Sequence, residues 1–299
     1  MKKIFLYWYK LKDGSANFGD ELGPYIVSRL SGIRCVFIKP IRKFIFLELF
    51  ESLFKKQSDY NFKDLVNIIS GKRRILITAG SVLNHFNIKN CDIWGSGIIT
   101  RNEKVPNANF YALRGEFSQL RIRELGYKVP NVLGDPALLL PLVYPVNVSK
   151  KYKLGIIPHY IHYEKVKAKF NTETVLVINL LDSIEDVINE INACQSTISS
   201  SLHGIIVSHA YNVPSLWYEL SDKALYGDNI KFADYFSSVA VKTYEPFLIP
   251  KINESEDFIE KITNHIRSEK SINSIQNDLR KIQTSLLKAA PFQVKREFF

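Results

Sequence analysis

The sequence predicts an α/β fold with two Rossmann-like domains that face a cleft, and a C-terminal helix that crosses back to the first domain. Short apolar strands alternate with helices along most of the chain, which is typical of parallel sheets covered by helices. Several strands end in glycine, which suits a backbone that lies close to a ligand. With 299 residues, 46% of them hydrophobic, the chain can bury two cores of about 100 to 150 residues each.

The expected domain boundary lies in the segment PLVYPVNVSKKYK, which combines two prolines with a cluster of lysines and reads as a linker. We expect an N-terminal domain over residues 1–145, a C-terminal domain over 146–270, and a C-terminal helix and tail over 271–299. The final residues, PFQVKREFF, are interpreted as a docking or membrane-touching tail, with disorder as the alternative.

The first strand is expected at Ile4–Tyr9, followed by a helix from near Asp20 to Gly32. Asp20 is the expected N-cap, and its carboxylate suits the positive end of the helix dipole. Asn17 and Asp20 either face the cleft or serve only as a turn residue and a cap.

Residues 36–56 contain phenylalanines and leucines at helical spacing, with cations at both ends. This pattern is typical of a helix that lies at a membrane interface. It also fits an ordinary packed helix, and Glu48 and Glu51 count against contact with an anionic surface.

Three strands of the first half, Arg74–Thr78, Asp92–Trp94 and Phe110–Leu113, are followed by glycine. Backbone at these ends is expected to approach a ligand above the sheet edge. The small residues there that we assign to the cleft are Gly80, Ser81 and Ser96. Arg114 directly follows the third strand, so its guanidinium is expected in the same cleft, where it would hold a phosphate or carboxylate; a surface ion pair is the alternative.

The second half centres on the stretch ACQSTISSSLHGIIVSHAYNVPSLWYE. It predicts a strand at Ser196–Ser200, a helix over about Leu202–Tyr211 and a second strand after Pro214. The helix N-terminus would offer unpaired N–H groups to an anion. His203 lies in its first turn, and the expected anion ligands are Ser200, Ser201, the amide of Leu202, and Lys223 from a later loop. His159 follows an earlier strand and is a further candidate to touch ligand.

Composition limits the function classes. The net charge of +10 resides in residues 1–150, where 23 Lys and Arg outnumber 12 Asp and Glu; this favours an anionic partner, or is only a solubilising surface. Three scattered cysteines favour a reducing compartment, and no metal site is expected. No apolar run is long enough to cross a bilayer, so we expect a cytoplasmic protein. Aromatic residues do not interleave with basic ones along one groove, which argues against a nucleic-acid partner.

Four segments, in this order, resemble the polysaccharide pyruvyl transferase family: NFGDELGP, the pair GSVLNHF and DIWGSG, LRGEFS followed by LGDPALLL, and SSSLHG followed by NVPSLWY. The likeness spans roughly residues 4 to 240. It implies two facing Rossmann-like domains, the arrangement called GT-B in glycosyltransferases. It also implies a cytoplasmic enzyme of bacterial exopolysaccharide or capsule synthesis.

The resemblance implies transfer of a pyruvyl group from phosphoenolpyruvate to a sugar, with a cyclic ketal formed across two hydroxyls, for example O4 and O6 of galactose. No cofactor is expected besides phosphoenolpyruvate as co-substrate. His203 is the candidate general acid/base, and Arg114 the clamp for the donor anion. Some family members have arginine directly before the Leu-His pair, where this chain has Ser201, so one positive charge is absent or comes from elsewhere.

The basic first half fits an acceptor sugar carried on a lipid diphosphate at the inner face of the cytoplasmic membrane, with peripheral membrane contact. Acceptor contacts are assigned to six residues: Asn17, Asp20, Gly80, Ser81, Ser96 and His159. Two other functions stay open, a glycosyltransferase that uses a nucleotide sugar and a non-catalytic protein that binds membrane or polymer.

Overall fold

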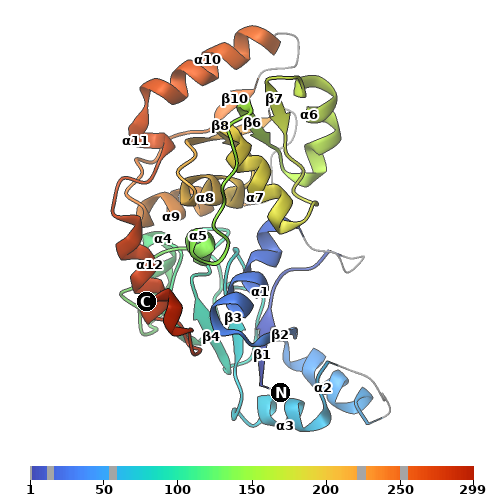
Figure 1. Ribbon diagram of the computed structural model, residues 1–299. Coiled ribbons are helices and arrows are strands. Elements are labelled where there is room, and N and C mark those ends of the chain that lie inside the picture. Colours follow the sequence, from blue (N-terminus) through green and yellow to red (C-terminus); the bar gives the residue numbers. More distant parts are fainter. Residues whose placement is uncertain (1, 12–16, 54–58, 221–226, 250–254) are drawn as a thin grey trace.

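A computed structural model describes residues 2–11, 17–53, 59–220, 227–249 and 255–299 of the chain (Figure 1). Its strands form two sheets of five parallel strands each. The predicted α/β class is thereby confirmed. The division into domains at residue 145 stays a prediction.

The first sheet has the order β2-β1-β3-β4-β5. Its strands are β1 (Lys3–Tyr7), β2 (Arg34–Phe37), β3 (Ile75–Ile77), β4 (Cys91–Trp94) and β5 (Asn109–Ala112). The second sheet has the order β10-β9-β8-β6-β7. Its strands are β6 (Tyr152–Ile157), β7 (Val175–Val177), β8 (Cys194–Ser199), β9 (Ser215–Leu220) and β10 (Phe247–Ile249). Numbered from its own first strand, each sheet has the order 2-1-3-4-5.

Helices connect most successive strands, while the links from β3 to β4 and from β4 to β5 are long loops; either kind of connection lets neighbouring strands run parallel. In the first half the helices are α1 (Phe18–Ser31), α2 (Arg42–Glu51), α3 (Phe62–Ile69), α4 (Glu116–Glu124), a 3₁₀ turn at Pro136–Leu139 and α5 (Leu140–Val143). In the second half they are a 3₁₀ turn at Tyr160–His162, α6 (Tyr163–Phe170), α7 (Ile184–Ala193), α8 (Leu202–Ala210) and α9 (Ile230–Ser238). The chain ends with α10 (Ser255–Ser268), α11 (Lys270–Asn273), α12 (Leu279–Lys288) and a 3₁₀ turn at Arg296–Phe298.

The start of α1 corrects the prediction that Asp20 is its N-cap. Asn17 caps the helix, because its side-chain oxygen accepts a hydrogen bond from the backbone N–H of Asp20 at 3.2 Å. Asp20 is instead the third helical residue, so its carboxylate is not used as the cap. The predicted end is confirmed, since Gly32 adopts the left-handed conformation at the C-cap that glycine favours.

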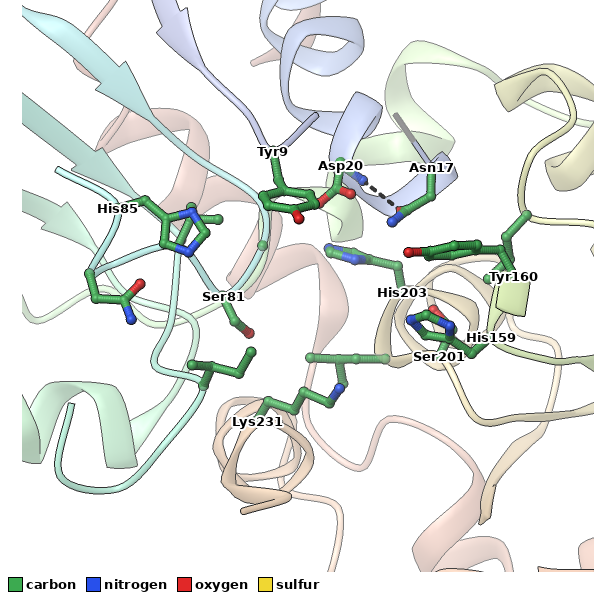
Figure 2. A pocket seen from close by; sticks show the side chains of 16 residues that line it. Tyr9, Asn17, Asp20, Ser81, His85, His159, Tyr160, Ser201, His203 and Lys231 are labelled. Atoms are coloured by element: carbon green, nitrogen blue, oxygen red, sulfur yellow. Dashed lines mark hydrogen bonds between the residues drawn. The ribbon is translucent and has the colours of Figure 1, made fainter. Parts of the chain in front are cut away.

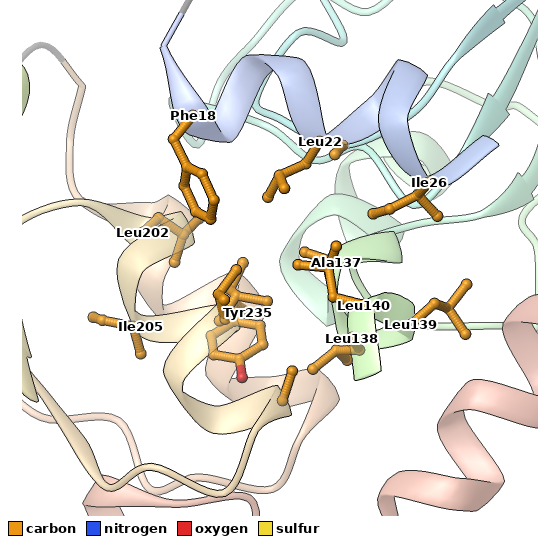
Figure 3. Close-up of a cluster of buried hydrophobic side chains, with 14 of the residues drawn as sticks. Phe18, Leu22, Ile26, Ala137, Leu138, Leu139, Leu140, Leu202, Ile205 and Tyr235 are labelled. Atoms are coloured by element: carbon orange, nitrogen blue, oxygen red, sulfur yellow. The ribbon is translucent and has the colours of Figure 1, made fainter. Parts of the chain in front are cut away.

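One continuous apolar core joins the two halves of the chain. It contains Leu22 and Ile26 of α1, residues 137–140, and Leu202 and Ile205 of α8 (Figure 3). Figure 1 shows the helices of this core stacked between the two sheets. The backbone also crosses directly, because Phe18 N donates to Leu180 O at 2.8 Å. This packing holds the carboxyl-end loops of both sheets against each other.

The C-terminal segment crosses back to the first half. The indole Nε1 of Trp94 on β4 donates to Leu286 O of α12 at 3.0 Å, and Phe292 packs edge-on against the Trp94 ring. Lys295 N donates to Leu30 O at the end of α1. The tail therefore docks on this chain's own first sheet.

Candidate active site

A cavity of about 410 Å³ lies where the carboxyl ends of both sheets meet (Figure 2). In each sheet the first and third strands are neighbours whose following segments diverge, and open α/β sheets bind ligands at such a switch point. Asn17 follows β1 and Ser81 follows β3, while His159 follows β6 and His203 follows β8. Both switch points open into this one cavity.

His203 sits in the first turn of α8 with its ring fixed from two sides. Its Nε2 is buried and lies 3.7 Å from Oδ2 of Asp135, a carboxylate with no exposed surface. Its Nδ1 lies beside Gly19, where a Cβ atom would come within 2.3 Å of that nitrogen. The ring therefore depends on a glycine of α1 and a carboxylate from the other half of the chain.

Asp135 owes its position to the sequence Gly-Asp-Pro. Its Oδ1 accepts a hydrogen bond from Ala137 N at 2.9 Å and so caps the 3₁₀ turn. Its Oδ2 has no hydrogen-bond partner in the described part of the chain and is directed at His203. A buried carboxylate beside an imidazole can orient the ring of a general base.

Asp20 provides a second titratable group beside His203. Burial raises its pKa to about 7, against the lowering effect of the nearby His203. Within the described residues its Oδ2 makes no hydrogen bond. At neutral pH this carboxyl group is therefore close to half protonated and can give or take a proton.

Lys231 of α9 brings positive charge to the cavity wall. Burial, and next the charge of Arg114, lowers its pKa to about 8. Of the described residues that line the cavity, it alone is a lysine or arginine. The N-termini of α1 and α8 add positive potential at the same place, and Ser201 at the N-cap of α8 makes no side-chain hydrogen bond to the helix. Together these groups suit an anion.

Two further histidines lie on opposite walls. The His159 ring lies against Tyr160, tilted by 33° with ring centroids 4.5 Å apart, and burial lowers the pKa of His159 to about 4. His85 has Nδ1 within 2.9 Å of the hydroxyl of Tyr7, and burial lowers its pKa too. Burial thus favours the neutral form of both imidazoles, which can donate to and accept from hydroxyl groups.

Eight of the residues predicted for the site line this cavity: Asn17, Asp20, Gly80, Ser81, His159, Ser201, Leu202 and His203. Two lie just beneath its wall. Ser96 is fully buried and donates to Gly80 O, and Ser200 accepts a hydrogen bond from His159 N at 2.9 Å. Lys223 lies outside the described residues.

Arg114 requires a correction. Its side chain has no exposed surface and does not line the cavity. Nε donates to Asp234, Nη1 to Ser81 Oγ at 2.6 Å and Nη2 to Ile98 O at 2.5 Å. The expectation of a guanidinium projecting into the cleft is wrong, because α9 approaches the end of β5 and supplies a buried carboxylate there.

Sequence reasoning missed the five other residues with polar side chains that line the cavity, Tyr9, Asn84, His85, Tyr160 and Lys231, and also Asp135 behind His203. Asn84, His85 and Asp135 lie within the segments GSVLNHF and LGDPALLL, so a search for chemical groups inside those segments could have found them. No local signal marks Lys231, since its role depends on how α9 packs. In the described part of the chain, no cluster of three or more His, Cys, Asp or Glu side chains could hold a metal ion.

Among the described residues there is also no helix with the length and apolar character needed to span a bilayer. The chain is 29% identical over 231 residues to an uncharacterised protein of Acanthamoeba polyphaga mimivirus, an alignment that covers 73% of this chain and 80% of that protein. A sequence model of the polysaccharide pyruvyl transferase family matches residues 17–222. This range includes Asp20, Asp135 and His203. The chain belongs to the polysaccharide pyruvyl transferase family and is a transferase.

Proposed function

We propose that this enzyme transfers a pyruvyl group from phosphoenolpyruvate to a hexose of a polysaccharide precursor and forms a cyclic ketal across two hydroxyls. The observation that supports this most is the position of His203 close to both Asp20 and the buried Asp135, in a cavity that Lys231 also lines. We regard the two-sheet arrangement as GT-B-like, with the reaction between the sheets.

Phosphoenolpyruvate carries a phosphate and a carboxylate, so its site needs positive potential. Lys231 and the N-terminus of α8 supply it on one side of the cavity. We propose that Lys231 takes the part of the arginine that some family members have at the position of Ser201. Arg114 supports this site from beneath, because it fixes α9 through Asp234 and also bonds Ser81.

The reaction moves two protons. Each of the two sugar hydroxyls loses one as its oxygen bonds to C2 of the pyruvyl unit. One proton is gained by the methylene carbon, which becomes the methyl group, and the other leaves with the phosphate as the C2–O bond breaks. Two proton-carrying groups in the cavity match this need.

We assign His203 as the base for a sugar hydroxyl, with Asp135 stabilising the imidazolium that forms. Nδ1 is the ring nitrogen for this step, since Nε2 is buried and directed at Asp135. Asp20 is the acid that protonates the methylene carbon, because burial keeps a large part of its carboxyl groups protonated at neutral pH. The neutral His159 and Asn84 on opposite walls contact the sugar.

The first test measures thermal stabilisation of the purified protein by phosphoenolpyruvate, inorganic phosphate, UDP and GDP. A ligand that binds only the folded state stabilises it by about 2.7 kcal/mol at a hundred times its Kd. We expect a shift with phosphoenolpyruvate that His203→Ala retains and Lys231→Met loses. A shift with UDP or GDP alone would identify a nucleotide-sugar glycosyltransferase instead.

The second test measures turnover as phosphate release from phosphoenolpyruvate with candidate saccharide acceptors. We expect His203→Ala to lower kcat by about 10²- to 10⁴-fold, the usual contribution of a general acid or base. A variant with unchanged kcat would exclude His203 from the chemistry and favour a binding protein.

A further inference from the structure

The helices α2 and α3 carry an unusual concentration of exposed apolar side chains. Seven of the fifteen exposed large hydrophobic residues in the described part of the chain lie within residues 46–69, with 39% to 65% of their surface exposed. They are Phe46, Leu47, Phe50, Leu53, Phe62, Val66 and Ile69, and we call them the α2–α3 surface. An apolar patch of this kind marks an interaction site more often than a chance arrangement.

The side chains of the α2–α3 surface are exposed, although the opposite faces of α2 and α3 pack against the rest of the protein. In α2 only Ile45 is buried, and the helix starts with a hydrogen bond from Arg42 N to Asn87 Oδ1 at 2.7 Å. In α3 a capping box between Asn61 and Asp64 fixes the first turn, while Leu65 and Ile68 enter the core. The exposed side chains therefore belong to ordered helices with an outward apolar face.

Exposed cations border these apolar side chains. Arg42 and Lys43 begin α2, and Lys63 begins α3; none of the three forms an ion pair with a carboxylate among the described residues. A surface hollow of about 540 Å³ brings Arg42 and Lys43 together with Phe46, Leu47 and Asn87.

Two of the acidic groups of this region, Glu48 and Asp64, are bonded inward, whereas Glu51 and Asp59 are exposed and Asp59 pairs with Arg34. Glu48 accepts a hydrogen bond from the Tyr60 hydroxyl at 2.6 Å, and Asp64 is held by Lys3 and the capping box. Glu48 was an argument against contact with an anionic surface, and this hydrogen bond weakens that argument.

We propose that the α2–α3 surface binds the anionic headgroup region of a lipid membrane, with its aromatic and leucine side chains inserted and its cations at the phosphates. Charge complementarity favours a membrane over a second copy of the chain. A two-fold dimer through this surface would bring the cations of both copies into one interface, whereas anionic lipids attract them.

The α2–α3 surface is connected to the wall of the cavity, which suggests a role for membrane binding. That role rests on the proposed function. The segment between β3 and β4 lines the cavity with residues 80–82, 84 and 85, and two residues further on Asn87 bonds both Arg42 N and Pro40 O. The wall of the cavity and the start of α2 are thus one connected structure. An enzyme held at the membrane by α2 and α3 would meet acceptor sugars that are carried on lipid.

The test is co-flotation of the full chain with vesicles of phosphatidylcholine alone or with a share of phosphatidylglycerol, at low and high salt. We expect binding to the anionic vesicles that salt weakens. The double variant Phe46→Ser, Phe50→Ser should lose it, and Arg42→Gln with Lys43→Gln should weaken it by roughly fivefold for each charge removed. The matched control is Leu120→Ser with Leu248→Ser, two exposed apolar residues on α4 and β10, which should bind as the wild type does.

Absence of binding to anionic vesicles at low salt would overturn the proposal, as would equal binding by the Phe46 and Phe50 variant. A dimer in light scattering that the same variant dissolves would assign the surface to a second copy. Stabilisation by phosphoenolpyruvate, measured on every variant, reports on the catalytic site alone, so failure of the membrane proposal and failure of the proposed function are separately visible.

Discussion

Arg114 and Asp234 form an ion pair with no exposed surface on either side chain, at 2.9 Å between Nε and Oδ2. It joins the end of β5 in the first half to α9 in the second. Asp234 also accepts hydrogen bonds from the N–H and hydroxyl of Ser118. The pair holds α9 in place at Asp234, three residues after Lys231. The side chain of Lys231 lines the cavity. Two buried groups that do not line the cavity thus place the lysine that does.

We predict that Arg114→Met destabilises the protein by about 3–5 kcal/mol, because it leaves the Asp234 carboxylate buried without its partner. Urea unfolding measures this difference. Arg114→Met combined with Asp234→Asn should recover part of the loss, since the buried charge is then gone. Equal losses in the single and double variants would mean that the ion pair is not what the substitution disturbs.

We predict that Gly19→Ala disables the enzyme by displacing the His203 ring. A Cβ at Gly19 would lie 2.3 Å from Nδ1, and such overpacking costs about 1–3 kcal/mol. The check is a double-mutant cycle in thermal unfolding with His203→Ala. In the His203→Ala background the cost of Gly19→Ala should fall towards zero; an undiminished cost would place the strain elsewhere.

We predict that Asp20 makes the free energy of unfolding fall as the pH rises from about 4, the pKa of an unfolded aspartate, to about 7. Burial raises the folded-state pKa to about 7, so the folded chain keeps a proton that the unfolded chain loses. Asp20→Asn should remove this fall, worth about 1.4 kcal/mol per pKa unit. Urea unfolding at pH 5 and pH 8 measures it, and Glu173→Gln, at an exposed carboxylate that does not line the cavity, is the control.

The same titration should appear in turnover. If protonated Asp20 is the acid, kcat declines as the pH rises through about 7, and Asp20→Asn abolishes that limb together with most of the rate. A wild-type profile that stays flat between pH 6 and pH 8 would contradict the assignment.

We predict that binding of phosphoenolpyruvate weakens as the pH rises through about 8. Burial lowers the pKa of Lys231 to about 8, so the free site loses its charge there. Lys231→Met should weaken binding by roughly 10- to 100-fold, the value of a charge-assisted hydrogen bond. Lys231→Arg keeps its charge at these pH values and should flatten the pH dependence in calorimetry; identical profiles for Lys231 and Lys231→Arg would exclude this lysine.

The sequence by itself determined the α/β class, the C-terminal return and half of the residues that line the cavity. Asn17, Ser81, His159 and His203 each follow a strand, and parallel strands bring such ends to one sheet edge, so adjacency in sequence was enough to place them. Asp135 and His85 lie inside two of the motifs identified in the sequence, but their chemical roles were not recognised there.

Only the tertiary structure decided which cation lines the cavity. Arg114 and Lys231 are more than a hundred residues apart, and both belong to segments that could reach the cleft. The packing of α9 against the end of β5 buries the arginine with Asp234 and leaves the lysine at the cavity. A buried guanidinium is stable only beside a carboxylate. The position of that carboxylate depends on contacts between segments far apart in the sequence, and no local sequence pattern encodes such contacts.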